Sequence, residues 1–140
     1  MREIKFRAWY PEKKLLFTWQ EILIDNIGVF LMRSDGEPET DYSLTPSAIL
    51  MQFTGLLDKN GTEIYEGDVV KTDSVNIQSG TDCNPYLRVV RFNQEEARFD
   101  FYQIDGEKQL AGQTLCKNNL EKRWEVIGNI YENPELVGGK

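Results

Sequence analysis

The sequence predicts a mainly β protein built from many short antiparallel strands. Apolar and polar residues alternate with a period of two along most of the chain, which is the pattern of half-buried strands. Turn signals recur at the spacing of roughly 8 to 12 residues that is typical of β sandwiches and barrels. No long apolar stripe with helical periodicity occurs, and this excludes a helical bundle.

The N-terminal part predicts a hairpin followed by further short strands. In Glu3–Tyr10 every second residue is apolar, so these apolar residues share one face of a strand. Pro11–Lys14 has the composition of a turn, and Leu15–Trp19 is predicted to be the partner strand of the hairpin. The segments that follow are predicted as two strands and one acidic, solvated loop: Glu21–Ile24, Ile27–Met32 and Ser34–Asp41.

The segment Leu44–Leu57 is ambiguous between helix and strand. Thr45 and Pro46 have the residue types of an N-cap and a first helical position, so a short helical turn is expected near 45–50. Gln52–Gly55 reads as a strand. The Asn60-Gly61 pair predicts a two-residue hairpin turn of type I′, with both residues at positive φ.

The C-terminal part predicts a small barrel with SH3-like strand order. Its expected elements are a turn at Glu66–Asp68, strands at Val69–Thr72, Tyr86–Phe92, Ala97–Ile104 and Gln113–Lys117, a long loop at Asp73–Pro85, a helical turn at Asn118–Lys122 and a last strand at Trp124–Tyr131. Gly128 inside the last strand predicts a bulge or a close backbone approach.

These elements predict two regions within a chain of 140 residues. Residues 1–60 supply N-terminal strands and hairpins, with the short helical turn near 45–50, packed against a small β-barrel formed by residues 61–137. Residues 138–140 are expected to fray.

Composition excludes several classes of function. The net charge of −7 argues against coating nucleic acid or an anionic membrane, since both require a positive surface. The absence of histidine excludes Ser-His-Asp and Cys-His catalysis, and two cysteines are too few for a zinc site made of His and Cys. We therefore expect no cofactor, no metal and no catalytic residue.

No apolar run approaches the length of a membrane helix, and the alternating N-terminus lacks the apolar region of a signal peptide. We therefore expect a cytoplasmic protein. In that compartment Cys83 and Cys116 are expected to be free thiols.

An acidic cluster around Glu63, Tyr65, Glu66 and Asp68 is one candidate site. Paired carboxylates can perform acid–base chemistry when one of them is desolvated. The sequence offers a simpler interpretation, in which Tyr65–Asp68 is a turn whose carboxylates accept hydrogen bonds from backbone N–H groups.

Aromatic residues near the N-terminus are a second candidate site. Trp9 and Trp19, with basic residues close by in the sequence, could form a stacking platform for single-stranded nucleic acid. Cross-strand packing of aromatic residues explains the same pattern without a ligand, and the acidic net charge favours that interpretation.

Three segments together resemble the YopX family of bacteriophage and prophage proteins. They are Met1–Trp9, Met51–Val70 (MQFTGLLDKNGTEIYEGDVV) and Trp124–Leu136 (WEVIGNIYENPEL), about a third of the chain in the expected order. The resemblance implies a phage-encoded, mostly β protein located in the cytoplasm of the host cell. It implies no activity and supplies no catalytic residue.

The expected function is that of a phage-encoded accessory protein that binds a protein partner, which could be host-encoded, or assembles with itself. The candidate binding residues are Trp9, Trp19, Tyr65, Glu66 and Asp68. A homo-oligomer is expected because short edge strands need covering. Two alternatives stay open: a nucleic-acid-associated β-barrel protein and a carboxylate-based enzyme.

Overall fold

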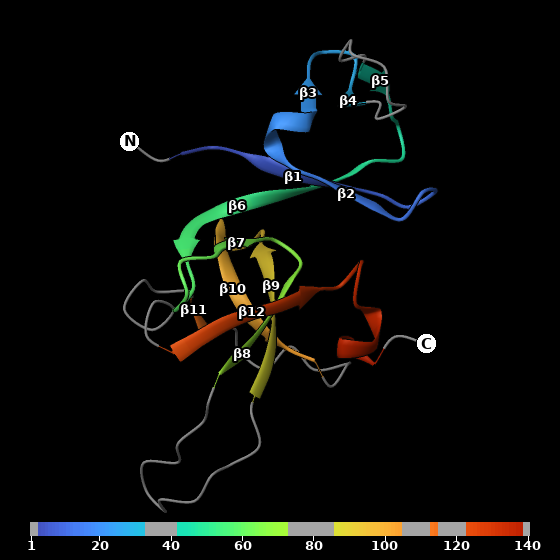
Figure 1. The fold of residues 1–140 in the computed structure, drawn as a ribbon. Coiled ribbons are helices and arrows are strands. Elements are labelled where there is room, and N and C mark those ends of the chain that lie inside the picture. Colours follow the sequence, from blue (N-terminus) through green and yellow to red (C-terminus); the bar gives the residue numbers. More distant parts are fainter. Residues whose placement is uncertain (1–2, 33–41, 73–85, 105–112, 115–122, 139–140) are drawn as a thin grey trace, which may run out of the picture. The chain divides into compact units, whose positions relative to one another are not determined.

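The computed structural model describes residues 3–32, 42–72, 86–104, 113–114 and 123–138 (Figure 1). Over these ranges the chain forms antiparallel strands and turns with two short 3-10 helices, which confirms the predicted mainly β class. The chain divides into two compact units, Met1–Phe53 and Thr54–Lys140. The predicted division into residues 1–60 and 61–137 stays a prediction.

The first unit contains parts of two sheets. The first sheet brings together β2, β1 and the beginning of β6, and the second is three-stranded with the order β3-β4-β5. The elements are β1 (Phe6–Tyr10), β2 (Leu15–Phe17), the 3-10 helix η1 (Trp19–Glu21), β3 (Ile22–Ile24), β4 (Val29–Met32), β5 (Tyr42–Leu44) and β6 (Ile49–Leu57).

The predicted first hairpin is confirmed, since β1 pairs antiparallel with β2 across the turn at residues 11–14. Alternation along β1 directs Ala8 toward a small apolar core, where it is buried together with Ile22 and Leu31. Phe17 and Leu50 pack against this core from the neighbouring strands. The two-residue period of the sequence therefore selects the inward face of β1.

The helical turn expected near 45–50 is wrong. Thr45–Ala48 forms one hydrogen-bonded turn, with Ala48 N donating to Thr45 O at 3.1 Å, and strand β6 begins at Ile49. The Thr45 hydroxyl donates backward to Ser43 O at 2.9 Å instead of accepting from a first helical turn. Pairing of Ile49 with Trp9 extends the sheet and overrides the weak local helix signal.

The second unit contains a five-stranded antiparallel sheet with the order β11-β10-β9-β8-β12, and it curls into a half-barrel (Figure 1). The strands of this sheet are β8 (Asp68–Thr72), β9 (Tyr86–Asn93), β10 (Arg98–Gln103), β11 (Gln113–Thr114) and β12 (Trp124–Asn129). The unit also contains β7 (Glu63–Tyr65), which pairs with β6, and the 3-10 helix η2 (Pro134–Val137). The specifically SH3-like arrangement stays a prediction.

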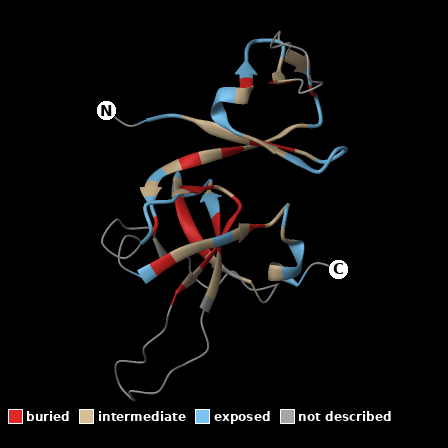
Figure 2. Cartoon of the chain, viewed as in Figure 1, coloured by how far each residue is buried: buried red, intermediate tan, exposed pale blue. Residues whose placement is uncertain are grey.

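The core of the second unit lies inside this curl, and Figure 2 shows buried residues along β8 and β10. Phe101 and Trp124 stack at its centre, with ring centroids 4.7 Å apart and an interplanar angle of 24°. The remaining buried members of this cluster are Ile64, Val70, Val90 and Phe99.

The predicted bulge at Gly128 is confirmed. The pairing of β12 with β8 shifts register between Val126 and Gly128. A Cβ atom at Gly128 would collide with the side-chain amide of Asn133, so only glycine lets the Asn133 side chain lie this close to the strand.

The two-residue turn predicted for Asn60-Gly61 is wrong. Asp58 N donates to Thr62 O at 2.8 Å and Gly61 N donates to Asp58 O at 3.1 Å, so the connection is a three-residue loop. Gly61 has a φ of 81°, whereas Asn60 is not among the residues with positive φ. A type I turn followed by one left-handed residue explains this geometry.

Replacing Gly61 with valine is expected to destabilise the protein by about 1 kcal/mol or more, because a β-branched residue resists positive φ. An added Cβ would meet no atom within 4 Å, so the cost is conformational and not steric. Urea denaturation measures it. Gly61→Asn is the matched control, because asparagine tolerates the left-handed region, and equal losses for the two variants would contradict this explanation.

Several predictions lie outside the described residues. They concern the loops at residues 34–41 and 73–85, the helical turn at residues 118–122, and Cys83 and Cys116.

Candidate functional site

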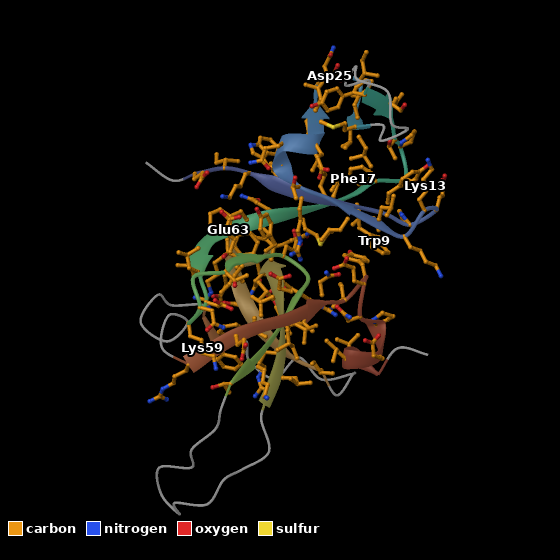
Figure 3. The ribbon with its side chains drawn as sticks, viewed as in Figure 1. Trp9, Lys13, Phe17, Asp25, Lys59 and Glu63 are labelled. Carbon is orange, nitrogen blue, oxygen red and sulfur yellow. The ribbon has the colours of Figure 1, made fainter. Side chains whose placement is uncertain are left out.

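The two tryptophans predicted as a stacking platform do not come together. Trp9 is 8% exposed, and alternation along β1 places it on the face opposite to Phe6. Trp19, in η1, packs its ring against Phe6 with centroids 5.9 Å apart. Figure 3 shows Trp9 and Phe17 on opposite sides of the β1–β2 hairpin, as their register requires. A joint platform of Trp9 and Trp19 is therefore absent from the first unit.

Trp19 and Phe6 instead form a partly exposed aromatic pair, called the Trp19 patch below. Trp19 is 37% exposed and Phe6 is half-buried. A capping box holds η1 in place, with Thr18 N and Thr18 Oγ1 donating to Glu21 Oε2 at 2.7 and 2.9 Å. The indole is thus presented on a short, well-anchored turn.

Two cations on β1 and just before it are engaged within the first unit. Lys5 Nζ lies 3.4 Å from Glu3 Oε1 and 4.5 Å from the centre of the Phe53 ring. Arg7 donates to Met51 Sδ at 3.6 Å. The charge of Lys5 is therefore partly neutralised by Glu3, and the Arg7 guanidinium contacts Met51 within the same unit. These contacts make the two cations less suited to binding phosphates.

The acidic cluster is a structural turn between β7 and β8. Asp68 is fully buried, and its Oδ2 accepts from Tyr65 N at 2.8 Å. The Tyr65 hydroxyl donates to Glu63 Oε2 at 2.8 Å. Gly67, with a φ of 82°, donates its N–H to Val90 O at 2.8 Å. Of the predicted residues in this turn, Tyr65 and Asp68 serve the fold.

Glu66, like Glu63, is a half-exposed member of this cluster. Desolvation raises the pKa of the Tyr131 hydroxyl, and the negative charge of the nearby Glu66 carboxylate raises that pKa further. The positive charge of Arg91 acts in the opposite direction and lowers it. Burial and the Glu66 charge thus both favour the protonated form of the Tyr131 hydroxyl.

Two other buried carboxylates were not singled out as functional residues. Asp58 is 2% exposed, and its Oδ1 accepts from Asn60 N at 2.8 Å and Thr62 N at 2.9 Å. Its Oδ2 accepts from Val126 N at 2.9 Å. The Asp-x-Asn-Gly pattern signals the local turn, but no sequence signal reveals the bond to Val126.

The second buried carboxylate, Asp100 on β10, is 1% exposed. It accepts from Arg98 Nε at 3.0 Å and from Asn93 Nδ2 at 3.1 Å. Each oxygen of this buried carboxylate therefore accepts a hydrogen bond from a neighbouring side chain, which is the usual state of a buried polar group.

The part of the chain that the structure describes contains no group of three His, Cys, Asp or Glu side chains arranged to hold a metal ion. In the same residues, no helix has the length and hydropathy needed to cross a membrane.

Comparison with known proteins decides the family. The YopX protein family matches residues 5–138, which is nearly the whole chain. The chain belongs to the YopX family. No curated protein matches it.

Solved structures similar to this YopX-family chain have the same fold over almost their whole length. Protein EF1440 from Enterococcus faecalis is 29% identical with a TM-score of 0.66, and the match covers 98% of this chain and 99% of that one. Protein yopX from Bacillus subtilis is 22% identical with a TM-score of 0.60, covering 97% of this chain and 98% of that one. Neither description states an activity.

Proposed function

We propose that this YopX-family protein is a phage- or prophage-encoded accessory protein that acts in the host cytoplasm by binding a protein partner, without catalysis. The observation that carries the proposal is the Trp19 patch. Trp19 packs on Phe6, a capping box holds the turn that carries it, and Trp19 remains 37% exposed. Exposed aromatic residues of this kind supply much of the binding energy in protein interfaces.

The use of the carboxylates supports a non-catalytic role. Asp58, Asp68 and Asp100 are the buried carboxylates of the described residues, and each accepts hydrogen bonds from backbone or neighbouring side chains. Catalysis by a carboxylate pair requires one desolvated acid whose proton is available to a substrate. The hydrogen bonds of these three residues serve the fold instead.

Charge complementarity indicates the chemistry of the partner. The chain carries 23 acidic and 16 basic residues, so it repels acidic surfaces and attracts basic ones. The partner is therefore a protein with an apolar centre and a basic rim, such as the nucleic-acid-binding surface of a host enzyme, and added salt slows their association.

Photo-crosslinking in the bacterial host tests this proposal. Benzoylphenylalanine replaces Trp19 in one variant, Glu66 in a second and Leu15 in a third. Leu15 is the matched control, because it is another exposed apolar residue of the same unit, 45% accessible. Position 19 is expected to yield a discrete adduct that protease destroys and nuclease does not. An adduct formed only at position 66, or one that nuclease removes, would refute the proposal.

The protein is expected not to bind single-stranded or duplex nucleic acid usefully at about 150 mM salt, because 23 acidic residues against 16 basic ones oppose its approach to phosphate. Lys5 and Arg7 are engaged by neighbours in their own unit. Fluorescence anisotropy with labelled oligonucleotides measures this. Sub-micromolar binding at that salt concentration would favour the nucleic-acid alternative.

A further inference from the structure

Asn60 has the features of an asparagine whose side-chain amide is attacked by the backbone nitrogen of the next residue. It is exposed, it precedes glycine, and it lies in the loop between β6 and β7. Gly61 is also exposed, and nothing lies within 4 Å of the position where a side chain would begin. A residue without Cβ leaves its backbone nitrogen open to approach the preceding side chain.

The chemistry requires only water. Gly61 N loses its proton and attacks Cγ of Asn60, a C–N bond forms, the Cγ–Nδ2 bond breaks, and ammonia leaves with the released proton. Water then opens the cyclic imide. Attack at Cγ gives aspartate, whereas attack at the backbone carbonyl carbon gives isoaspartate, in which the main chain runs through the former side chain.

We propose that Asn60 is a site of spontaneous deamidation, and that isoaspartate formation there releases the loop that covers the outer edge of β12. Gly61 N must leave its 3.1 Å hydrogen bond to Asp58 O before it can attack. Both residues 60 and 61 are at the surface, where opening of a single turn requires little free energy.

The loop covers a strand edge that would otherwise be open. β12 is the last strand in the order of its sheet. Lys59 N donates to Trp124 O at 2.9 Å, and Asp58 Oδ2 accepts from Val126 N at 2.9 Å. These two bonds occupy polar groups on the free side of β12. An uncovered edge of this kind is a template for pairing with another chain.

Deamidation weakens the contacts between the β6–β7 loop and β12 in two ways. Asn60 Nδ2 donates to Glu125 Oε1 at 3.3 Å, and the new carboxylate replaces this attraction with repulsion between like charges. Isoaspartate also lengthens the main chain by one carbon between Lys59 and Gly61. The Asp58 carboxylate then no longer meets Asn60 N and Thr62 N in the geometry seen here.

Other asparagines of the chain serve as internal controls. Asn93 precedes Gln94 and Asn129 precedes Ile130, and a bulky following residue hinders the attack of its own nitrogen. The Asn93 side chain is also held by Asp100 and by the N–H groups of Glu95 and Glu96. Asn129 is 3% exposed and similarly bonded.

The test is prolonged incubation of the whole protein at mildly alkaline pH, beside an Asn60→Ser variant that lacks the reacting amide. Peptide mass spectrometry measures exchange of NH2 for OH at each asparagine, and an isoaspartate-specific assay identifies the product. Hydrogen exchange follows the amides of Lys59 and Val126. We expect Asn60 to be modified several-fold more than Asn93 and Asn129. Protection of both amides should fall as isoaspartate accumulates and stay unchanged in Asn60→Ser.

Modification at Asn60 no greater than at Asn93 would overturn the assignment of the site. Modification with full retention of protection at Lys59 and Val126 would overturn the proposed release of the loop. Equal loss of protection in aged Asn60→Ser would show that another change causes the opening, and it would overturn the proposal as well.

Discussion

Replacing Asp58 with alanine is expected to lower the free energy of unfolding by roughly 2–4 kcal/mol, the range for a buried, multiply bonded polar group. The change removes the acceptor of three backbone N–H groups, those of Asn60, Thr62 and Val126. The bond to Val126 spans 68 residues of sequence, so its loss affects the sheet as well as the local turn.

Asp25→Ala is the matched control for this prediction. Asp25 also accepts from two backbone N–H groups, Ile27 N at 2.7 Å and Gly28 N at 3.1 Å, but its turn is exposed and water can replace it. A loss of about 1 kcal/mol or less is expected there. Urea denaturation measures both variants. Equal losses would contradict the special role assigned to the bond between Asp58 and Val126.

Replacing Gly128 with alanine is expected to lower stability by about 1–3 kcal/mol, the usual cost of overpacking. The new methyl group would overlap Oδ1 and Cγ of Asn133 and approach Leu136 Cδ1 to 3.1 Å. Asn133 cannot move away without cost, because its backbone N–H donates to Asn129 O at 3.0 Å and its Oδ1 accepts from Asn129 N at 3.3 Å.

A double-mutant cycle isolates this overlap. In an Asn133→Ala background the two closest atoms that meet the new methyl group are gone and Leu136 Cδ1 remains, so Gly128→Ala should cost less there by about 1 kcal/mol or more. Thermal or urea denaturation of the four proteins gives the coupling free energy. Strictly additive losses would show that Gly128 is needed for backbone conformation and not for the close approach of Asn133.

Local sequence signals predicted the strands well where alternation was strong. Along β1 one face is uniformly apolar, and burial of Ala8 against Ile22 follows from the period of two. The segment at Thr45–Leu50 failed because its helix signal was weak, while pairing of Ile49 with Trp9 is a long-range interaction that no local pattern contains.

The candidate site was predictable only in part. The closeness of Trp9 and Trp19 in the sequence suggests a joint site, but the two faces of β1 separate them, and of the two only Trp19 is exposed. Asp68 was correctly interpreted as a turn residue that accepts from the backbone. The bond between Asp58 and Val126 joins residues far apart in the chain, so composition and spacing could not reveal it.

The most direct measurement is calorimetric titration of the purified protein with the partner recovered by crosslinking. Trp19→Ser and Glu66→Gln are compared with the wild type. We expect Trp19→Ser to weaken binding about tenfold or more, which corresponds to about 1.4 kcal/mol, and Glu66→Gln to leave the affinity within about a factor of two. Unchanged binding by Trp19→Ser together with loss of binding by Glu66→Gln would contradict it.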